Sequence, residues 1–452
     1  MKILIAGDGK VGATLTRQLS AEGYELTLID SNPDVLESSI NRYDVMTVYG
    51  NCASMEILRQ AEVEKADLLI AVTSADEVNL LCCTTAHVLN SKLHTIARIR
   101  NPEYAEQVYA MRDVFALSMA VNPELQAARE IERLLKYPGF LKRESFAKGR
   151  VEIVELRVEP GGKLCDVSLS SLNSIVHCKV LVCAVVRNGA TVAPDGQCVL
   201  RQDDRIFVTA STNELVMLIK SLGIDTHKVS RVMLAGGGRV SYYLAQLLEK
   251  SGMSVQIIEQ NRERCQTLAK SLPYASVTYG DASDMSLLES EGLPECDAFV
   301  TLTGLDEINM ILSLSARQRG VKQVVTKLGH VEASNVLASL PLGSVVSPRE
   351  LCCNTIVRYV RAMRKQSGAA VAIHSIANGM AEAIEFHVEE ETLHCGQPLH
   401  TLRLKPGVLI ACIIHGVNTD IPSGGSSFTP GDTLIVVTNA GRVINELNDI
   451  FE

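Results

Sequence analysis

The chain repeats itself, and this duplication constrains the fold more than any other feature of the sequence. Residues 3–12 read ILIAGDGKVG and residues 232–241 read VMLAGGGRVS. Four further landmarks follow in the same order, always 229 or 230 residues apart: LTLID and VQIIE, Asn32 and Asn261, VYGNCAS and TYGDASD, and AVTSADEVNLL and TLTGLDEINMI. Five matches at one spacing are hard to obtain by chance. The sequence therefore predicts a tandem duplication whose two copies share one fold.

Each copy itself has two parts. In the first part, the Val/Ile/Leu-rich runs ILIAG, ELTLID, VMTVYG, LLIAV and TIARI alternate with helical segments. This pattern predicts an α/β fold with a doubly wound, Rossmann-like parallel sheet. A helix follows, opened by Asn122-Pro123 in one copy and Ser347-Pro348 in the other. A smaller α/β unit completes each copy, and we expect linkers at Lys148–Arg150 and Gln366–Ala369.

These patterns divide the chain into six expected segments. Two Rossmann-like domains, two connecting helices and two small domains are predicted, in chain order, at 1–120, 121–140, 141–225, 229–347, 348–367 and 368–452.

Composition narrows the classes of function. The net charge of −9 argues against binding to nucleic acid or to anionic lipid, because phosphate affinity comes mainly from Lys and Arg. The 13 cysteines form no CxxC and no zinc spacing, so they fit small core residues in a reducing cytosol. No signal segment begins the chain, and the apolar run Val408–Ile414 is too short to cross a bilayer. We therefore expect a cytoplasmic protein whose membrane role is peripheral.

The first copy carries a dinucleotide fingerprint. Gly7, Gly9 and Gly12 follow a strand and open a helix, which is the context that the GxGxxG pattern requires. The pyrophosphate of the ligand would lie at the positive end of that helix. Asp30 ends the next strand, where an acid holds the ribose hydroxyls and repels a 2′-phosphate. The pattern predicts NAD(H) rather than NADP(H).

The second copy departs from this pattern at one position. Gly236 and Gly238 are present, but Ser241 replaces the third glycine, so we expect looser packing between helix and strand. Glu259 is the expected ribose acceptor. Asn51 also stands where the second copy has Asp281, and these differences leave the ligand of each half open.

Further polar residues follow the fourth and fifth strands of each copy. Ser74 with Glu77, and Thr303 with Asp306, have the spacing of helix-capping boxes, although strand ends at this edge also bind nucleotides. Arg98 and Arg100 flank the end of the fifth strand, with Lys327 as the counterpart of Arg98. An arginine there either binds phosphate oxygens or is solvated, and the residues alone leave both open.

No catalytic group accompanies the fingerprint. A dehydrogenase needs a proton donor or acceptor beside the nicotinamide, and the ten histidines form no pattern with Lys or Asp. The sequence therefore favours a protein that is not an enzyme.

With these motifs in place, the chain resembles the TrkA family of cytosolic regulatory proteins of Trk-type bacterial potassium uptake. Members contain two tandem RCK (regulator of potassium conductance) modules, each with a Rossmann-like and a small C-terminal domain. The resemblance rests on GDGKVG, LID, TSADEVN, ARIRNPEY, GGGRVS and PGDTLIVV. It implies contacts with NAD(H), or with ATP or ADP, in the first half from Gly7, Asp8, Gly9, Lys10, Val11, Asp30, Thr73, Ser74 and Arg98. By matched position it implicates, in the second half, Gly236, Gly237, Gly238, Arg239, Val240, Glu259, Thr303 and Lys327.

The resemblance also implies partners. Its members assemble into homo-oligomeric rings beneath a membrane-embedded potassium-translocating subunit of the TrkH or TrkG type, so a dimer or tetramer is expected. On this interpretation, nucleotide binding gates potassium uptake. An NAD-dependent oxidoreductase and a free-standing nucleotide sensor remain the alternatives. The motifs do not choose between NADH, NAD, ATP and ADP as the effector.

Overall fold

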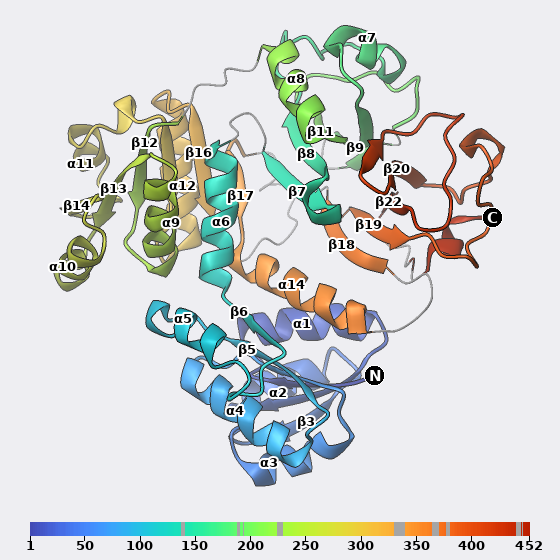
Figure 1. Ribbon diagram of the computed structural model, residues 1–452. Helices are drawn as coiled ribbons and strands as arrows, with labels where there is room; N and C mark the ends of the chain where they lie inside the picture. Colours follow the sequence, from blue (N-terminus) through green and yellow to red (C-terminus); the bar gives the residue numbers. More distant parts are fainter. Residues whose placement is uncertain are drawn as a thin grey trace.

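Two large parallel sheets and two smaller antiparallel sheets form the molecule (Figure 1). The structure is a computed structural model of the 452-residue chain. It describes residues 1–136, 141–187, 190–192, 194–223, 229–329, 340–363, 370–376, 380–439, 444 and 446–452. The predicted α/β fold class, with parallel Rossmann-like sheets in both copies, is confirmed.

The first large sheet has the strand order β3-β2-β1-β4-β5-β6, with all neighbours parallel. Its strands are β1 Lys2–Ala6, β2 Glu25–Asp30, β3 Met46–Tyr49, β4 Leu68–Ala71, β5 His94–Arg98 and β6 Met119–Val121. Its helices are α1 Lys10–Ala21, α2 Pro33–Ile40, α3 Met55–Gln60, α4 Asp76–Leu89 and α5 Pro102–Ala110. The order reverses between β1 and β4, which makes the carboxyl ends of these strands the expected ligand crevice. The sequence pattern missed the short sixth strand.

The second large sheet repeats this topology as β14-β13-β12-β15-β16-β17. Its strands are β12 Arg231–Ala235, β13 Ser254–Glu259, β14 Ser276–Tyr279, β15 Ala298–Thr301, β16 Gln323–Lys327 and β17 Ser344–Val346. Its helices are α9 Arg239–Lys250, α10 Arg262–Ser271, α11 Met285–Ser290 and α12 Asp306–Gln318. The prediction that both copies share one fold is therefore confirmed for the large sheets.

The small sheets also match, as β10-β9-β11-β8-β7 and β21-β20-β22-β19-β18. The first contains β7 Lys142–Phe146, β8 Val151–Arg157, β9 Leu181–Arg187, β10 Ala190–Val192 and β11 Arg205–Ser211, with α7 Leu172–Val176 and α8 Thr212–Leu222. The second contains β18 Ala370–Ile376, β19 Ala381–His387, β20 Val408–His415, β21 Asn418–Asp420 and β22 Thr433–Asn439. Short 3-10 turns lie at Val63–Lys65, Ala147–Gly149, Leu169–Ser171, Leu293–Glu295, Leu399–Thr401 and Leu447–Ile450.

The first predicted linker is wrong. Lys148–Arg150 lies in the tight turn between β7 and β8, which pair with each other inside the small sheet. The Lys-Gly-Arg run reverses the chain within one sheet and does not mark a boundary between domains. The second predicted linker, Gln366–Ala369, lies outside the described residues.

The two connecting helices are exchanged between the halves (Figure 1). Helix α6, Pro123–Lys136, contributes Ala127, Ala128, Ile131, Leu134 and Leu135 to one apolar core with β12, β13 and α9 of the second half. Helix α14, Pro348–Met363, contributes Cys352, Cys353, Ile356, Val357 and Val360 to the core beside β1 and α1 of the first half. Both stripes recur at helical spacing, so each helix presents one apolar face. That face completes the core of the other half.

Polar contacts hold the exchanged helices in place. Gln323 of β16 donates from its side-chain amide to the carbonyl of Leu134 on α6, at 2.7 Å. On the other side, the Arg361 guanidinium of α14 pairs with the Glu22 carboxylate at the end of α1. The predicted helix starts are also confirmed, since Asn122 accepts from Leu125 N at 2.9 Å.

The two small sheets pack against each other through a shared apolar core. It joins Phe146, Ile153 and Phe207 of the first small sheet to Ile414 and Ile435 of the second. At its margin, His374 Nδ1 lies 2.6 Å from a Glu144 carboxylate oxygen. The halves are therefore in contact through their small domains as well as through the exchanged helices.

Two further sequence predictions concern cysteines and membranes. All 13 cysteines are free thiols, and the adjacent pairs Cys82-Cys83 and Cys352-Cys353 are fully buried, so their predicted role as small core residues is confirmed. Among the described residues, no helix has the length and apolarity needed to cross a membrane.

Candidate functional site

The glycine-rich loop between β1 and α1 has the tight turn that the fingerprint predicts. Gly7 has φ +96°, a left-handed conformation that favours glycine, and a Cβ there would lie 2.8 Å from Thr73 N. A Cβ on Gly12 would lie 2.0 Å from the Gly7 carbonyl oxygen. Gly9, in contrast, faces open space and is the N-cap of α1. In this fully described loop no side chain caps the helix, so its first amides are available to an anion.

Asp30 closes the loop from the end of β2. Its carboxylate accepts hydrogen bonds from Asp8 N at 2.7 Å and from Asn32 N at 2.8 Å. The side chain therefore holds the glycine loop against the start of α2. Each carboxylate oxygen has a further lone pair, which leaves acceptors for the hydroxyls of a ribose.

Asp8 lies behind this loop rather than in the crevice. The side chain is almost fully buried, and Ser39 of α2 donates its hydroxyl to Asp8 Oδ2 at 2.5 Å. The pKa of the Asp8 carboxyl is raised to about 6, mainly by burial and also by the neighbouring Asp30 charge, while the hydrogen bond from Ser39 opposes the rise. The expected contact of Asp8 with a ligand can therefore come only from its backbone.

A buried asparagine that is not among the predicted site residues organises the end of β4. Asn79, fully buried on α4, accepts from both the amide and the hydroxyl of Thr73, at 2.8 and 2.7 Å. Its amide group donates to the Arg98 carbonyl at 2.9 Å. Asn309 makes the same contacts to Thr303 and Lys327 in the second half. The final Asn of the duplicated motifs ADEVN and LDEIN is the signal that identifies this residue.

The predicted capping boxes are wrong. Helices α4 and α12 begin after Ala75 and Leu305, and neither N-cap residue makes a side-chain capping bond. The acid that follows is used elsewhere. Asp76 accepts from Arg100 N at 2.7 Å, and Asp306 accepts from Gly329 N at 2.9 Å. Asp76 and Asp306 therefore hold the chain that follows the fifth strand of each sheet. The end of the fourth strand is held instead by Asn79 or Asn309.

Arg98 and Lys327 occupy the ends of β5 and β16. Each is half-buried and donates to a strand-end carbonyl, that of Thr73 or of Thr303. Burial lowers the pKa of both side chains. The Nε of Arg98 is buried without a partner within the described residues. Each crevice therefore contains a partly desolvated cation, Arg98 in the first half and Lys327 in the second. An anionic ligand would offset the free-energy cost of burying that charge.

The second glycine loop repeats the first with local changes. Glu259 accepts from Gly237 N and Asn261 N, both at 2.7 Å, as Asp30 does in the first half. Ser241 is fully buried, and its hydroxyl donates to the Gly236 carbonyl. The looser packing expected here is thus offset by a hydrogen bond that glycine cannot make.

The remaining predicted residues fall into two groups. Lys10, Arg239, Gly238 and Ser74 are exposed around the two crevices. Val11 and Val240 are buried in the apolar cores beside α1 and α9, so their side chains are not available to a ligand. Asn51 and Asp281, which differ between the halves, make the same turn contact to the amide two residues on.

Residues of both halves converge on Glu124, in the first turn of α6. Burial raises the pKa of its carboxyl, and the positive charges of Arg100, Arg98 and Arg239 oppose that rise. Tyr243 of α9 bridges nearby, since its hydroxyl contacts the Asn122 side chain at 3.0 Å and the Arg100 carbonyl at 3.2 Å. The crevice of the first half therefore adjoins the glycine loop of the second.

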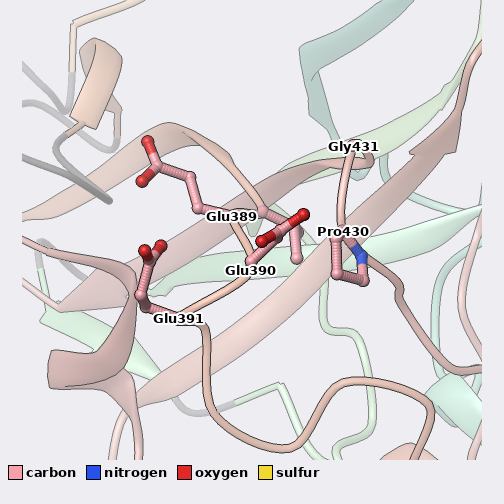
Figure 2. Close-up of a pocket in the computed structure, with 6 residues that line it drawn as sticks. Glu389, Glu390, Glu391, Pro430 and Gly431 are labelled. Carbon is pink, nitrogen blue, oxygen red and sulfur yellow. The ribbon is translucent and has the colours of Figure 1, made fainter.

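A separate acidic pocket lies in the second small domain (Figure 2). Glu389, Glu390 and Glu391 line it together with Val388, Pro430 and Gly431. Their carboxylates point in different directions, and within the described residues no group of acidic, histidine or cysteine side chains has the arrangement of a metal site.

Comparison with known proteins matches this architecture. The TrkA-N domain family model matches residues 3–122 and 232–348, and the TrkA-C domain model matches residues 153–223. The Trk system potassium uptake protein TrkA of Vibrio alginolyticus is 30% identical, over 100% of this chain and 99% of that protein. A TrkA homolog from Archaeoglobus fulgidus is also 30% identical, over the whole of both chains.

Two solved structures have a similar fold. The GsuK RCK domain superposes with a TM-score of 0.60 at 17% identity, covering 97% of this chain and 92% of that one. The GsuK channel bound to NAD superposes with a TM-score of 0.59 at 19% identity, covering 97% and 76%.

Proposed function

The chain belongs to the TrkA family of Trk system potassium uptake proteins, and from that premise we propose that it is a nucleotide-binding regulatory subunit that gates a membrane potassium transporter. Its relatives support a regulatory role in potassium transport. The finer proposal is that NAD(H), or ATP or ADP, occupies the crevices at the two glycine loops and sets the state of the transporter.

The proposed ligand contacts follow the geometry of each crevice. In the first half they are Gly7, Asp8, Gly9, Lys10, Val11, Gly12, Asp30, Thr73, Ser74 and Arg98. In the second half they are Gly236, Gly237, Gly238, Arg239, Val240, Glu259, Thr303 and Lys327. The pyrophosphate would meet the uncapped start of α1 or α9, and the ribose would meet Asp30 or Glu259.

One observation carries the proposal of gating: the helices α6 and α14 are exchanged. Each crevice therefore adjoins a residue of the other half, since Arg98 lies near Cys352 of α14 and Lys327 lies near Glu124 of α6. A nucleotide that favours one arrangement of a crevice then favours one arrangement of the shared helices. The required energy is small, because a coupling of about 1–3 kcal/mol changes affinity roughly 5- to 150-fold. Binding energy of that size is within reach of a single charged contact at Asp30 or Arg98.

The proposal extends to assembly and place in the cell. We infer a homo-oligomer, a dimer, tetramer or ring, docked at the cytoplasmic face beneath a translocating subunit of the TrkH or TrkG type. The functional units would be two Rossmann-like domains at 1–120 and 229–347 and two small domains at 141–225 and 368–452. The connecting helices within 121–140 and 348–367 would couple them.

The same proposal holds that bound NADH is an effector and is not consumed. Two parts test it. Calorimetric titration of the full chain with NADH, NAD, ATP and ADP should show saturable binding, and NADH absorbance should stay constant with added carbonyl compounds. Steady substrate-dependent oxidation would instead identify an oxidoreductase.

Gating is tested in cells. Deleting the gene should slow potassium uptake at low external potassium, and a plasmid copy should restore it. The protein should also co-purify with a transporter from detergent-solubilised membranes. Unchanged uptake together with a protein that purifies alone would refute the transport assignment and leave only nucleotide binding.

A further inference from the structure

The carboxyl group of Asp8 is an unusual component of a phosphate-binding loop. It lies between two residues of the fingerprint, and only 1% of the residue is exposed. Ser39 donates to one of its oxygens, while the other, Oδ1, is buried without a hydrogen-bond partner within the described residues. A buried carboxylate with an unsatisfied oxygen is costly when ionised.

The groups that contact the Asp8 carboxyl supply no positive charge to balance it when it is ionised. Helix α2 presents the uncharged Ser39 hydroxyl, and β2 presents the Asp30 carboxylate, whose charge acts on Asp8. Beyond Asp30, the loop after β3 holds the Cys52 thiol, which the Asp30 charge also reaches. Lys10, two residues along the loop, is exposed to solvent. The two groups that act on the Asp8 pKa are thus the neutral Ser39 hydroxyl and the negative Asp30 carboxylate.

The second half lacks this carboxyl. Gly237 occupies the equivalent position, and Leu268 replaces Ser39. A Cβ on Gly237 would lie 2.6 Å from Leu268 Cδ1, so an aspartate at position 237 would clash with the leucine side chain. Arg264 also donates from Nε to the Gly237 carbonyl at 2.8 Å, which adds a positive charge behind this loop. The two loops therefore have the same backbone contacts. Behind the first lies the carboxyl group of Asp8, and behind the second lies the positive charge of Arg264.

We propose that Asp8 makes nucleotide binding in the first half depend on a proton, so that this half binds its anionic ligand together with one hydrogen ion and the second half does not. The inference rests on the proposed function, since it assigns a property to the same crevice. A pyrophosphate at the start of α1 would lie next to the loop that contains Asp8. It would repel an ionised Asp8 and leave a protonated one undisturbed.

The direction of the effect follows from that repulsion. Without ligand the Asp8 pKa is about 6. A bound anion raises it, so the bound state holds more protons and affinity increases as the pH falls from 8 toward 6. A ligand-bound pKa about one unit higher strengthens binding about fivefold between pH 8 and pH 6 and takes up about half a proton at pH 6.5. The second half should show neither effect.

The test uses the full chain and NAD, whose pyrophosphate does not titrate in this range, unlike the terminal phosphate of ATP or ADP. Titration calorimetry at pH 6.0, 6.5, 7.0 and 8.0, in two buffers of different ionisation enthalpy, measures affinity and proton uptake together. The expected result is one site that tightens about fivefold toward pH 6 with proton uptake, and one that does not change. If NAD does not bind at any pH, NAD(H) is not the ligand of these crevices, and the proposed proton coupling fails with it. If NAD binds equally at all pH values without proton uptake, Asp8 has no such role.

Variants assign the proton to Asp8. Asp8→Asn keeps the shape and the backbone contact to Asp30. It should abolish proton uptake and bind at pH 8 at least as tightly as the wild type does at pH 6. Ser39→Ala removes the donor that favours the ionised form, so it should move the pH dependence to higher pH. Proton uptake that persists in Asp8→Asn would overturn the assignment. Because uptake is measured on the wild type, the test stands even if a variant folds poorly.

Discussion

Asp30→Ala tests the most specific claim about the first crevice, and the structure predicts two separable effects. The carboxylate accepts from the amides of Asp8 and Asn32. The Asp8 amide is buried, so leaving it without an acceptor should lower the free energy of unfolding by about 1–3 kcal/mol. A lost charged hydrogen bond to ribose costs about 1.5–3 kcal/mol of binding free energy, or roughly 10- to 100-fold in affinity for NAD(H).

Asp30→Asn separates the two effects. The asparagine carbonyl can still accept from Asp8 N, so its cost in stability should stay below about 1 kcal/mol, whereas the negative charge at the ribose is lost. Asp34→Ala is the matched control, because it removes an exposed charge from the first turn of α2 without a described side-chain contact to the loop. Glu259→Gln is the corresponding change in the second half.

The assay combines urea unfolding with calorimetric titration of NADH into each full-length variant. We expect Asp30→Asn to weaken one of the two sites and Glu259→Gln to weaken the other, while Asp34→Ala behaves as wild type. If Asp30→Asn unfolds like wild type and both sites keep their affinity, the ribose is held by other residues and the interpretation of the first crevice is wrong.

Two further predictions concern stability. Asn79→Ala removes a fully buried hydrogen-bond network at the end of β4 and should lower the free energy of unfolding by about 1–3 kcal/mol in urea titrations. Asn309→Ala should have the same effect in the second half. A change below half that size would mean that water replaces the amide. Arg361→Ala breaks the partly buried ion pair that holds α14 to α1 and should cost about 1 kcal/mol, whereas Arg59→Ala, from an exposed and longer pair, should cost almost nothing. Equal effects of the two arginine variants would show that the α14 contact contributes no more than a surface pair.

The parts of the fold that the sequence predicts are those controlled by local periodicity. The buried strands, the glycine loop and the two connecting helices all follow from runs of apolar residues, turn glycines and Asn-Pro or Ser-Pro starts. The positions of Asp30 and Glu259 at strand ends were also predictable, whereas their contact with a ribose stays a prediction. Repetition strengthened each of these inferences, since every feature had to recur about 229 residues later.

Other features depend on contacts that no local pattern encodes. Ser74 and Glu77 have the spacing of a capping box, but the helix starts two residues after Ser74 and Asn79 satisfies the strand end instead. The exchange of α6 and α14 between the halves could not be predicted from the sequence either. Their apolar stripes show that each helix needs a partner, yet the same stripe fits its own half or the other one. Only the packed structure distinguishes these two partners.

The exchange changes what the duplication means for regulation. If each half folded on its own, the two copies would be independent domains joined only by the chain between them. Here each half completes the core of the other, and Glu124 lies among charges from both crevices. The copies differ at residues beside the crevices, with Asp8 opposite Gly237 and Arg98 opposite Lys327, while the sheet order is unchanged. The two crevices therefore differ in charge but share one helical interface, which is the arrangement that the proposed coupling between them requires.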